Sequence, residues 1–262
     1  MGRFKNAIAV VTGAGSGIGE QTAIQLANEG AKVILVGRTR SKLERVVDAI
    51  NSSAAEPAAT VFQADVTKEE EMEQLGKLIK QEYGDLHVVV NNAGSSGKSS
   101  ILDMDADEWD RIQETNVKSV FLVSKVLGPV MIEASENAGQ TDPAANRAIV
   151  NVASLSGHKA GAKIPHYSSS KAAVINFTKA LALEFAPHGI RVNSVSPGFA
   201  ETPLTAEGLK NKRFEEAIQR NTALSRVGKP EEIARVITFA ASQEASYMTG
   251  SDLLVDGGWL IK

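Results

Sequence analysis

The sequence predicts an α/β fold: a doubly wound, seven-stranded parallel sheet of the Rossmann-like type, with helices on both faces. Short apolar runs alternate with amphipathic stretches along nearly the whole chain, which is typical of a parallel sheet buried on both sides. A glycine-rich loop directly follows the first apolar run, as in dinucleotide-binding sheets. The 262 residues contain no internal repeat, composition break or linker, so we expect a single domain covering 1–262.

The strands are predicted from runs that are apolar throughout and too short for most helices. The first reads AIAVV, and the second reads KVILV. Continuous apolar runs of this length indicate strands that are covered by helices on both faces. The predicted strands cover residues 7–11, 32–36, 59–63, 86–90, 148–152, 190–195 and 253–255.

The helices are predicted from apolar positions three and four residues apart, with polar residues between them. We expect Ser41 to cap the second helix, and Pro230 to open the last helix at its first position. Gly128 and Pro129 are expected to bend the long fourth helix. The predicted helices cover residues 20–29, 41–50, 69–81, 106–134, 166–186 and 230–241.

Two segments stand outside this alternation. Residues 136–147 are polar and rich in turn-forming residues, which predicts a surface loop. Residues 203–221 mix polar and apolar positions with helical tendency, and we interpret them as a lid over a substrate. Ordinary packing would explain the same composition of this second segment equally well.

Composition argues against several classes of protein. The net charge is −3 and no basic cluster is present, which argues against a nucleic-acid partner. Cysteine is absent and the four histidines lack ligand spacing, so we expect no metal site. No apolar run is long enough to span a membrane, and the first strand begins too early for a signal peptide. We therefore expect a soluble, cytoplasmic protein.

The glycine-rich loop between the first strand and the first helix reads TGAGSGIG over residues 12–19. Its glycines allow a tight turn and a close approach to a pyrophosphate, while the N-terminus of the next helix attracts anions. The spacing contains one residue more than the G-x-G-x-x-G fingerprint. The loop nevertheless predicts a dinucleotide site, with contacts from Gly13, Gly15, Ser16, Gly17, Ile18 and Gly19.

The end of the second strand bears on the choice between NAD and NADP. An acidic residue here binds the 2′-hydroxyl of NAD, whereas an arginine accommodates the 2′-phosphate of NADP. This chain has Arg38, Thr39 and Arg40 and no carboxylate, so we predict NADP, with Arg38 and Thr39 at the site. Arginines that are merely solvated loop charges are the alternative.

Two further strand ends complete the predicted cofactor site. Asp65 and Val66 follow the third strand, and Asp65 is placed to accept a hydrogen bond from the adenine amino group. Asn92, Ala93 and Gly94 follow the fourth strand, where small residues let the backbone lie along a ribose. A helix cap at Asp65 and a turn at Gly94 are compatible alternatives.

Tyr167 and Lys171 are four residues apart in a predicted helix, which places them on one face. A phenol beside an ammonium suggests a proton donor, because the positive charge favours the phenolate. Lowering a tyrosine pKa from about 10 to about 7 requires roughly 4 kcal/mol. We expect the lysine and a positively charged cofactor ring to supply this stabilisation together in a dry cleft. A simple surface pair is the alternative.

Five motifs stand in the order and spacing of the short-chain dehydrogenase/reductase family, which the chain resembles over nearly its whole length. It is most similar to the branch of 3-oxoacyl-carrier-protein reductases and secondary-metabolism ketone reductases. The motifs are Thr12-Gly13-x-x-x-Gly17-x-Gly19, Asn91-Asn92-Ala93-Gly94, Ser154, Tyr167-x-x-x-Lys171 and Pro197-Gly198-x-x-x-Thr202.

The resemblance implies a role for each motif. Tyr167 exchanges a proton with a carbonyl oxygen, and Ser154 hydrogen-bonds the same oxygen. Lys171 lowers the pKa of the tyrosine and holds the nicotinamide ribose, and Asn116 keeps a water linked to this lysine. The remaining cofactor contacts, beside the nicotinamide carboxamide, are Pro197, Gly198, Phe199 and Thr202.

The resulting expectation is an NADP(H)-dependent oxidoreductase that acts on a ketone or secondary alcohol. A non-redox cyclase or isomerase and a cofactor-sensing binding protein are the alternatives. The substrate segments 95–100, 155–165 and 203–221 contain no fixed anion clamp and do not identify the substrate. The resemblance also implies a homotetramer or homodimer, joined through the helices at 106–134 and 166–186.

Overall fold

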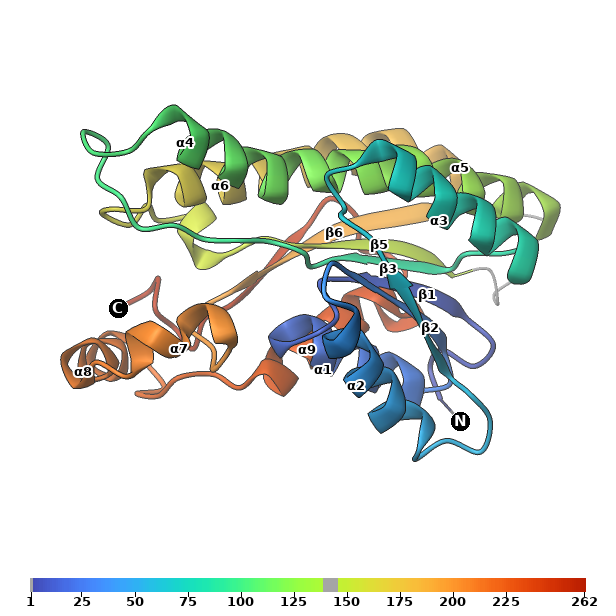
Figure 1. The fold of residues 1–262 in the computed structure, drawn as a ribbon, viewed down its shortest axis with the longest axis horizontal. Helices are drawn as coiled ribbons and strands as arrows, with labels where there is room; N and C mark the ends of the chain where they lie inside the picture. Colours follow the sequence, from blue (N-terminus) through green and yellow to red (C-terminus); the bar gives the residue numbers. More distant parts are fainter. Residues whose placement is uncertain (1, 139–145) are drawn as a thin grey trace.

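The seven strands form one parallel sheet in the order β3-β2-β1-β4-β5-β6-β7, which confirms the predicted doubly wound fold (Figure 1). The computed structural model describes residues 2–138 and 146–262, so most of the predicted loop 136–147 lies outside the described residues. The strands are β1 (Ile8–Thr12), β2 (Lys32–Gly37), β3 (Ala59–Gln63), β4 (Val88–Asn91), β5 (Arg147–Val152), β6 (Ile190–Pro197) and β7 (Asp252–Val255).

The first strand shows why these runs are apolar throughout. Ala9 and Val11 point into the hydrophobic core on one face of the sheet, while Ile8 and Val10 point into the core on the other face. Val10 pairs with Ile34 of β2 on one side and with Val89 of β4 on the other. Since β1 lies between β2 and β4, the strand order reverses here, and ligands bind at such a point.

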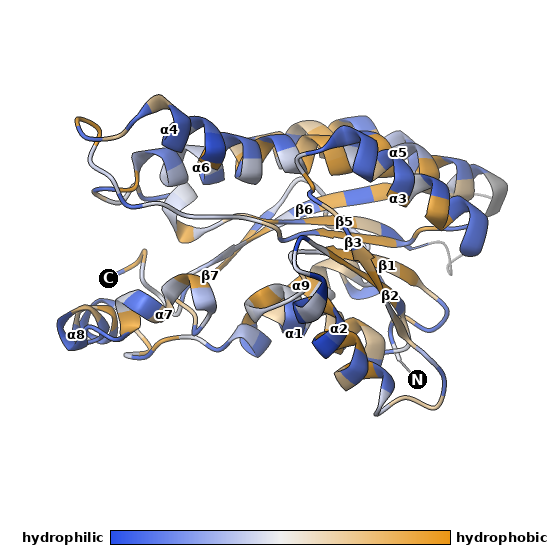
Figure 2. Ribbon diagram, in the orientation of Figure 1, coloured by the Kyte–Doolittle hydropathy of each residue, from blue (hydrophilic) through white to orange (hydrophobic). Residues whose placement is uncertain are grey.

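Helices cover both faces of the sheet, and Figure 1 shows the two layers. Figure 2 shows hydrophobic colours concentrated on the strands and on the helix surfaces that face them. One layer contains α1 (Gly17–Asn28), α2 (Arg40–Asn51) and α9 (Pro230–Ala241). The other contains α3 (Glu69–Glu82), α4 (Ala106–Gln113), α5 (Ser119–Ala138) and α6 (Pro165–Phe185).

The prediction of one continuous helix over 106–134 is wrong, because the helix is interrupted. A π-helical segment, η1 (Glu114–Lys118), separates α4 from α5, and α5 continues to Ala138. The π turn places Asn116 against the segment after β4, where it makes three side-chain hydrogen bonds. Such turns are frequent at functional sites.

Gly128 and Pro129 are neighbours within α5. Gly128 lies against the ring of Phe185, whose Cζ would be 2.6 Å from a Cβ at this position. Pro129 lies inside α5, where it has no N–H to donate to the preceding turn. The second helix also begins differently from the prediction, because Thr39 rather than Ser41 is its N-cap residue.

The segment after β6 forms two short helices, α7 (Pro203–Leu209) and α8 (Lys212–Asn221), which lie beyond one end of the sheet (Figure 1). An aromatic cluster connects them to the sheet. The ring of Phe199, just after β6, lies 5.6 Å from Phe214 of α8 and 4.9 Å from Trp259. The short 3-10 helices are η2 (Leu155–Gly157), η3 (Ala186–His188) and η4 (Gln243–Ala245).

Candidate active site

The predicted catalytic side chains come from three elements around the carboxyl end of β5. Ser154 follows β5 and begins η2, Asn116 lies in η1, and Tyr167 and Lys171 belong to α6. Pro165 occupies the first turn of α6, where its missing N–H costs nothing. This start places Tyr167 in the first turn and Lys171 one turn later on the same face.

Lys171 is buried, with 5% of its surface exposed. Its Nζ donates a 2.8 Å hydrogen bond to the Val152 carbonyl and lies 5.9 Å from the centre of the Tyr167 ring. Burial disfavours the ammonium and lowers the pKa of Lys171 to about 8. The lysine is therefore close to its titration point under ordinary conditions, unlike a surface lysine.

The protein alone does not lower the pKa of Tyr167. Burial of its phenol raises the pKa above the usual value, and a hydrogen bond with the Ser154 side chain opposes this only in part. In this structure the phenol therefore remains protonated at neutral pH. The low value anticipated from the sequence requires a further positive charge beside the ring.

Ser154 is held by the local backbone. Its Oγ accepts a 3.1 Å hydrogen bond from the N–H of Ser156 and so caps η2. This leaves the hydroxyl proton for another acceptor. The Ser154 hydroxyl lies near enough to the Tyr167 phenol to oppose the rise in its pKa, and the shared role at a substrate oxygen stays a prediction.

Asn116 links η1 to the segment after β4. Its Oδ1 accepts from the N–H of Ser95 at 2.8 Å, and its Nδ2 donates to the Ser95 carbonyl at 2.9 Å and to Ser170 Oγ at 3.0 Å. A Cβ placed on Gly94 would lie 3.3 Å from Asn116 Oδ1 and 3.5 Å from Lys171 Nζ. Asn116 and Lys171 thus both lie beside Gly94, and the proton-relay role stays a prediction.

The glycine-rich loop packs directly against the end of β4. Gly13 has a φ of +64° and a Cβ there would lie 2.9 Å from the Cα of Ala93. Asn92 Nδ2 donates to the carbonyls of Thr12 and Gly13 at 3.0 and 3.2 Å. Thr12 Oγ1 accepts from the N–H groups of Asn92 and Ala93, both at 3.0 Å. Thr12 was not among the predicted site residues, although it opens the motif.

The first turn of α1 fits an anionic group. Ser16 is the N-cap residue, but its side chain makes no capping hydrogen bond, so the first N–H groups of α1 remain available to a ligand. A cleft of about 460 Å³ opens here between the glycine-rich loop and α7. Gly17 lies on one wall, and a Cβ there would be 3.3 Å from Thr202 Cβ on the other. A pyrophosphate requires a cradle of this kind.

Comparison with known proteins agrees with this geometry. Residues 13–260 match the family model described as enoyl-(acyl carrier protein) reductase. The chain is 38% identical to the 3-oxoacyl-[acyl-carrier-protein] reductase FabG of Thermotoga maritima, over 99% of this chain and 100% of that protein. It is 36% identical to a cyclohexanol dehydrogenase of Acinetobacter sp., over 99% of this chain and 97% of that one.

A solved structure gives the same answer in three dimensions. A short-chain type dehydrogenase/reductase from Mycobacterium marinum aligns with a TM-score of 0.90 and 36% identity, covering 99% of this chain and 97% of that one. This chain belongs to the short-chain dehydrogenase/reductase family. It is accordingly an oxidoreductase of a family that transfers hydride with a nicotinamide cofactor.

In this short-chain dehydrogenase/reductase, the two arginines at the end of β2 have different surroundings. Arg40 pairs with Glu44 at 2.7 Å, whereas Arg38 is exposed near Asp65. Burial alone would raise the pKa of Asp65, but hydrogen bonds from Thr67 and the charge of Arg38 outweigh it and lower the pKa. Asp65 does not cap α3, since Lys68 is the N-cap residue there.

Some predicted cofactor residues are placed to contribute backbone rather than side chain. Val66 is buried in one hydrophobic core, and Ile18 packs against the other. Gly198, after Pro197, lies against Asp256, whose Cα would be 2.6 Å from a Cβ at this position. Phe199 packs in the aromatic cluster with Phe214 and Trp259, so its ring connects α8 to the end of β6.

Arg45 is a site residue that the sequence did not reveal. It lies on α2 and forms two hydrogen bonds with the Glu20 carboxylate, at 2.9 and 2.7 Å. The same guanidinium donates to the carbonyl of Gly15 at 3.2 Å. Arg45 therefore connects α1, α2 and the glycine-rich loop. Its partners are distant in sequence, and no spacing rule indicates the contact.

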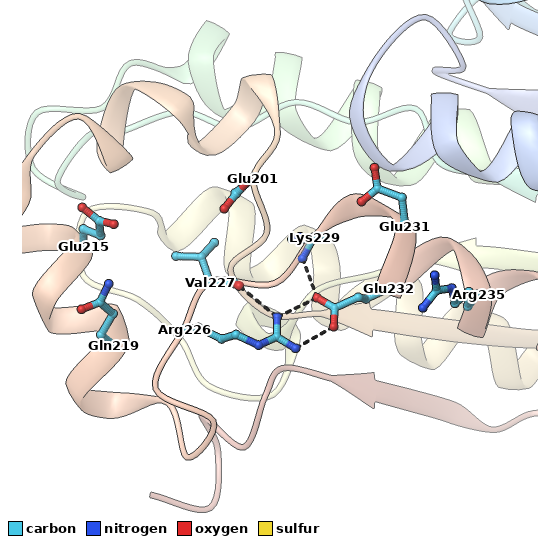
Figure 3. A pocket seen from close by; sticks show the side chains of 9 residues that line it. All are labelled: Glu201, Glu215, Gln219, Arg226, Val227, Lys229, Glu231, Glu232 and Arg235. Atoms are coloured by element: carbon cyan, nitrogen blue, oxygen red, sulfur yellow. Dashed lines mark hydrogen bonds and ion pairs between the residues drawn. The ribbon is translucent and has the colours of Figure 1, made fainter.

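A second cleft, of about 750 Å³, lies between α8 and the start of α9 and contains none of the predicted catalytic residues (Figure 3). Its walls carry charges of both signs, and the guanidinium of Arg226 pairs with Glu232 at 2.6 Å. In the described part of the chain no group of three potential metal ligands comes together. None of the described helices combines the length and apolar character that a membrane crossing needs.

Proposed function

We propose that this protein is an NADP(H)-dependent oxidoreductase that interconverts a ketone and a secondary alcohol, with Tyr167 as the general acid and base. One observation carries the proposal: a buried Lys171 lies beside Tyr167, whose phenol lies near the Ser154 side chain, next to the glycine-lined strand ends. The relatives named as a 3-oxoacyl reductase and a cyclohexanol dehydrogenase act on this class of compound by their names, which supports the same chemistry.

In the reductive direction Tyr167 donates its phenolic proton to the substrate oxygen. Its raised pKa keeps this proton in place until the oxygen becomes basic. Ser154 donates a hydrogen bond to the same oxygen and stabilises the charge that develops there. Bound nicotinamide supplies the hydride in reduction and accepts it in oxidation. Lys171 then favours the phenolate left on Tyr167 and, with a pKa of about 8, can return a proton to this phenolate.

NADP is the proposed cofactor because Arg38 is exposed at the end of β2 and no carboxylate follows it there. Its guanidinium suits two-point binding of a phosphate. The residues of the glycine-rich loop hold the pyrophosphate, and Asn92 fixes this loop through the carbonyls of Thr12 and Gly13.

The test is a panel of ketones and secondary alcohols, followed by the absorbance of NADPH and NADH. We expect NADPH-linked reduction of at least one class of ketone. Product formation without any change in nicotinamide absorbance would instead indicate the non-redox cyclase or isomerase. NADP binding without turnover across the panel would indicate a cofactor sensor. Either result would overturn the proposal.

We also infer a homotetramer or homodimer, joined through α5 and α6. Phe121 on α5 and Leu183 on α6 support this assembly, since they are 44% and 80% exposed. Light scattering tests it, and a monomer at micromolar concentration would contradict it. The lid role of α7 and α8 and the single domain over 1–262 also stay proposals.

A further inference from the structure

The residue before Tyr167 is a buried histidine that the proposed mechanism does not use. His166 is fully buried in the first turn of α6. Within the described residues neither ring nitrogen makes a hydrogen bond of good geometry, although Nε2 lies 3.2 Å from Oε1 of Glu108 on α4. Buried polar groups are nearly always satisfied, so this pair calls for an explanation.

Glu108 connects His166 to the segment that follows β4. Its second oxygen, Oε2, accepts a 2.6 Å hydrogen bond from Ser99 Oγ. The N–H of Ser99 donates at 2.9 Å to the carbonyl of Lys163, just before α6. Gly97 lies directly over the pair, and a Cβ at this position would overlap both the His166 ring and the Glu108 carboxylate. Residues 97–99 are thus fastened to the N-terminus of α6.

The beginning of the same segment is fastened to the proposed catalytic residues. Ser95 exchanges two backbone hydrogen bonds with the side chain of Asn116, at 2.8 and 2.9 Å. Gln113, in the last turn of α4, donates from Nε2 to the His166 carbonyl at 3.0 Å. Residues 95–99 therefore form a strap with two anchors, one at Asn116 and one at the residue next to Tyr167.

The strap has little else to hold it in place. It reads SSGKS, with no apolar side chain to bury against a core. A contact between the fully buried ring of His166 and the Glu108 carboxylate specifies one arrangement where packing alone would allow several. Because Gly97 has no Cβ, the backbone of the strap can approach the pair closely.

We propose that Glu108 and His166 are positioning residues, which fix the strap 95–99 as a wall of the carbonyl pocket at a set distance from Tyr167. The proposal rests on the proposed ketone chemistry for the identity of the pocket. Loosening the pair lets the substrate carbonyl leave its near-attack position, although the cofactor site beyond Gly94 is untouched. The pair therefore acts on the substrate and not on NADPH.

The test uses the full-length protein and four variants. Glu108→Gln keeps an oxygen for Ser99 and removes the charge, and His166→Gln removes the other partner. A double variant combines them. Asp107→Asn is the matched control, because Asp107 is an exposed carboxylate on the same helix. NADPH affinity and thermal unfolding are measured for each, so that misfolded protein is recognised.

Two readouts are compared. The first is hydrogen–deuterium exchange of the backbone amides of residues 95–100, which requires no turnover. We expect this exchange to be about tenfold faster in each single variant than in the wild type. The double variant should exchange at the same rate as the single variants, because both substitutions break the same contact. The KM for the best ketone of the panel should rise about fivefold or more, with the affinity for NADPH unchanged. Asp107→Asn should alter neither quantity.

The outcomes separate this proposal from the proposed function. Unchanged exchange over 95–100 in both single variants, or additive effects in the double variant, would overturn the strap anchor. Faster exchange with an unchanged KM would reduce the pair to a structural contact and overturn its positioning role. If both single variants misfold, Ser99→Ala removes only the strap's hydrogen bond to Glu108 and must give the same two changes. A wild-type protein that reduces no ketone would refute the proposed function, while coupled exchange would still support the anchor.

Discussion

Lys171 directs its Nζ to the carbonyl of Val152 at 2.8 Å, and it lies 5.9 Å from the ring centre of Tyr167. The folded protein thus holds a buried ammonium whose partner is a neutral backbone group. Burial of this charge without a carboxylate is unfavourable, which is why the pKa of Lys171 falls from 10.5 to about 8. The catalytic geometry is therefore maintained at the expense of stability.

Replacing Lys171 with methionine should stabilise the protein at pH 7. The shift from 10.5 to about 8 corresponds to about 3 kcal/mol, from which the lost hydrogen bond to Val152 takes back about 1 kcal/mol. Urea unfolding at pH 7 should show a gain of about 2 kcal/mol. The control is Lys179→Met, an exposed lysine of the same helix, which should change stability by less than about 0.5 kcal/mol.

The advantage of Lys171→Met should shrink as the pH rises. The folded-state pKa is lower than that of the unfolded chain, so folding releases a proton between about pH 8 and pH 10.5. Wild-type stability, relative to the variant, therefore increases with pH in this window. Between pH 7 and pH 9.5 the difference should fall by about 2 kcal/mol. A difference that is independent of pH would argue against a buried ammonium.

Tyr167→Phe should abolish turnover and preserve the cofactor site. Loss of the proton donor is expected to lower kcat by a factor of about 10² to 10⁴. The phenyl ring keeps its packing, so NADPH binding, measured by fluorescence, should remain within about twofold of wild type. Tyr247→Phe is the control because Tyr247 is fully exposed. Retained carbonyl reduction in Tyr167→Phe would require another proton donor.

Much of the fold was predictable because burial on both faces leaves a simple pattern. Val10 and Val11 face opposite cores, so neither position tolerates a polar residue, and the run is apolar throughout. The π-helical break at Glu114–Lys118 was not predictable. The amphipathic pattern continues through it, and only the tertiary hydrogen bonds of Asn116 to Ser95 and Ser170 distinguish the turn.

The candidate site likewise contains residues that the sequence predicted and contacts that it did not. Tyr167 and Lys171 were found because four-residue spacing in a helix is a local property. The links from Arg45 to Gly15 and from His166 to Glu108 depend on how separate helices pack, which no local pattern indicates. The sequence predicted a lowered pKa for Tyr167 in the presence of a bound cofactor. In the protein alone, burial raises the pKa of Tyr167 instead.

Arg38 should determine the preference between the two cofactors. Arg38→Ala is expected to weaken NADPH binding by about 10- to 100-fold, since a charge-assisted contact contributes about 1.5–3 kcal/mol. NADH affinity should change little because it carries no 2′-phosphate. Arg40→Ala is the matched control, as Arg40 pairs with Glu44, and it should have a small effect. A wild-type preference for NADH, or equal effects of the two substitutions, would overturn the assignment of Arg38.

Gly19→Ala should damage the glycine-rich loop although alanine is the better helix former. In an open helix position this change stabilises by about 1 kcal/mol. At Gly19, however, a Cβ would collide with the side-chain amide of Asn92 and with the carbonyl of Gly13, which Asn92 binds. The collision pushes two strand ends apart, so we expect a loss of about 1–3 kcal/mol in stability and a large loss of NADPH affinity.

Gly84→Ala provides the contrast, because a Cβ there meets nothing within 4 Å and the φ of +71° alone opposes it. That variant should lose about 1 kcal/mol of stability and no affinity. Equal NADPH affinity in Gly19→Ala and wild type, measured by calorimetry, would show that the Asn92 contact does not shape the cofactor cradle.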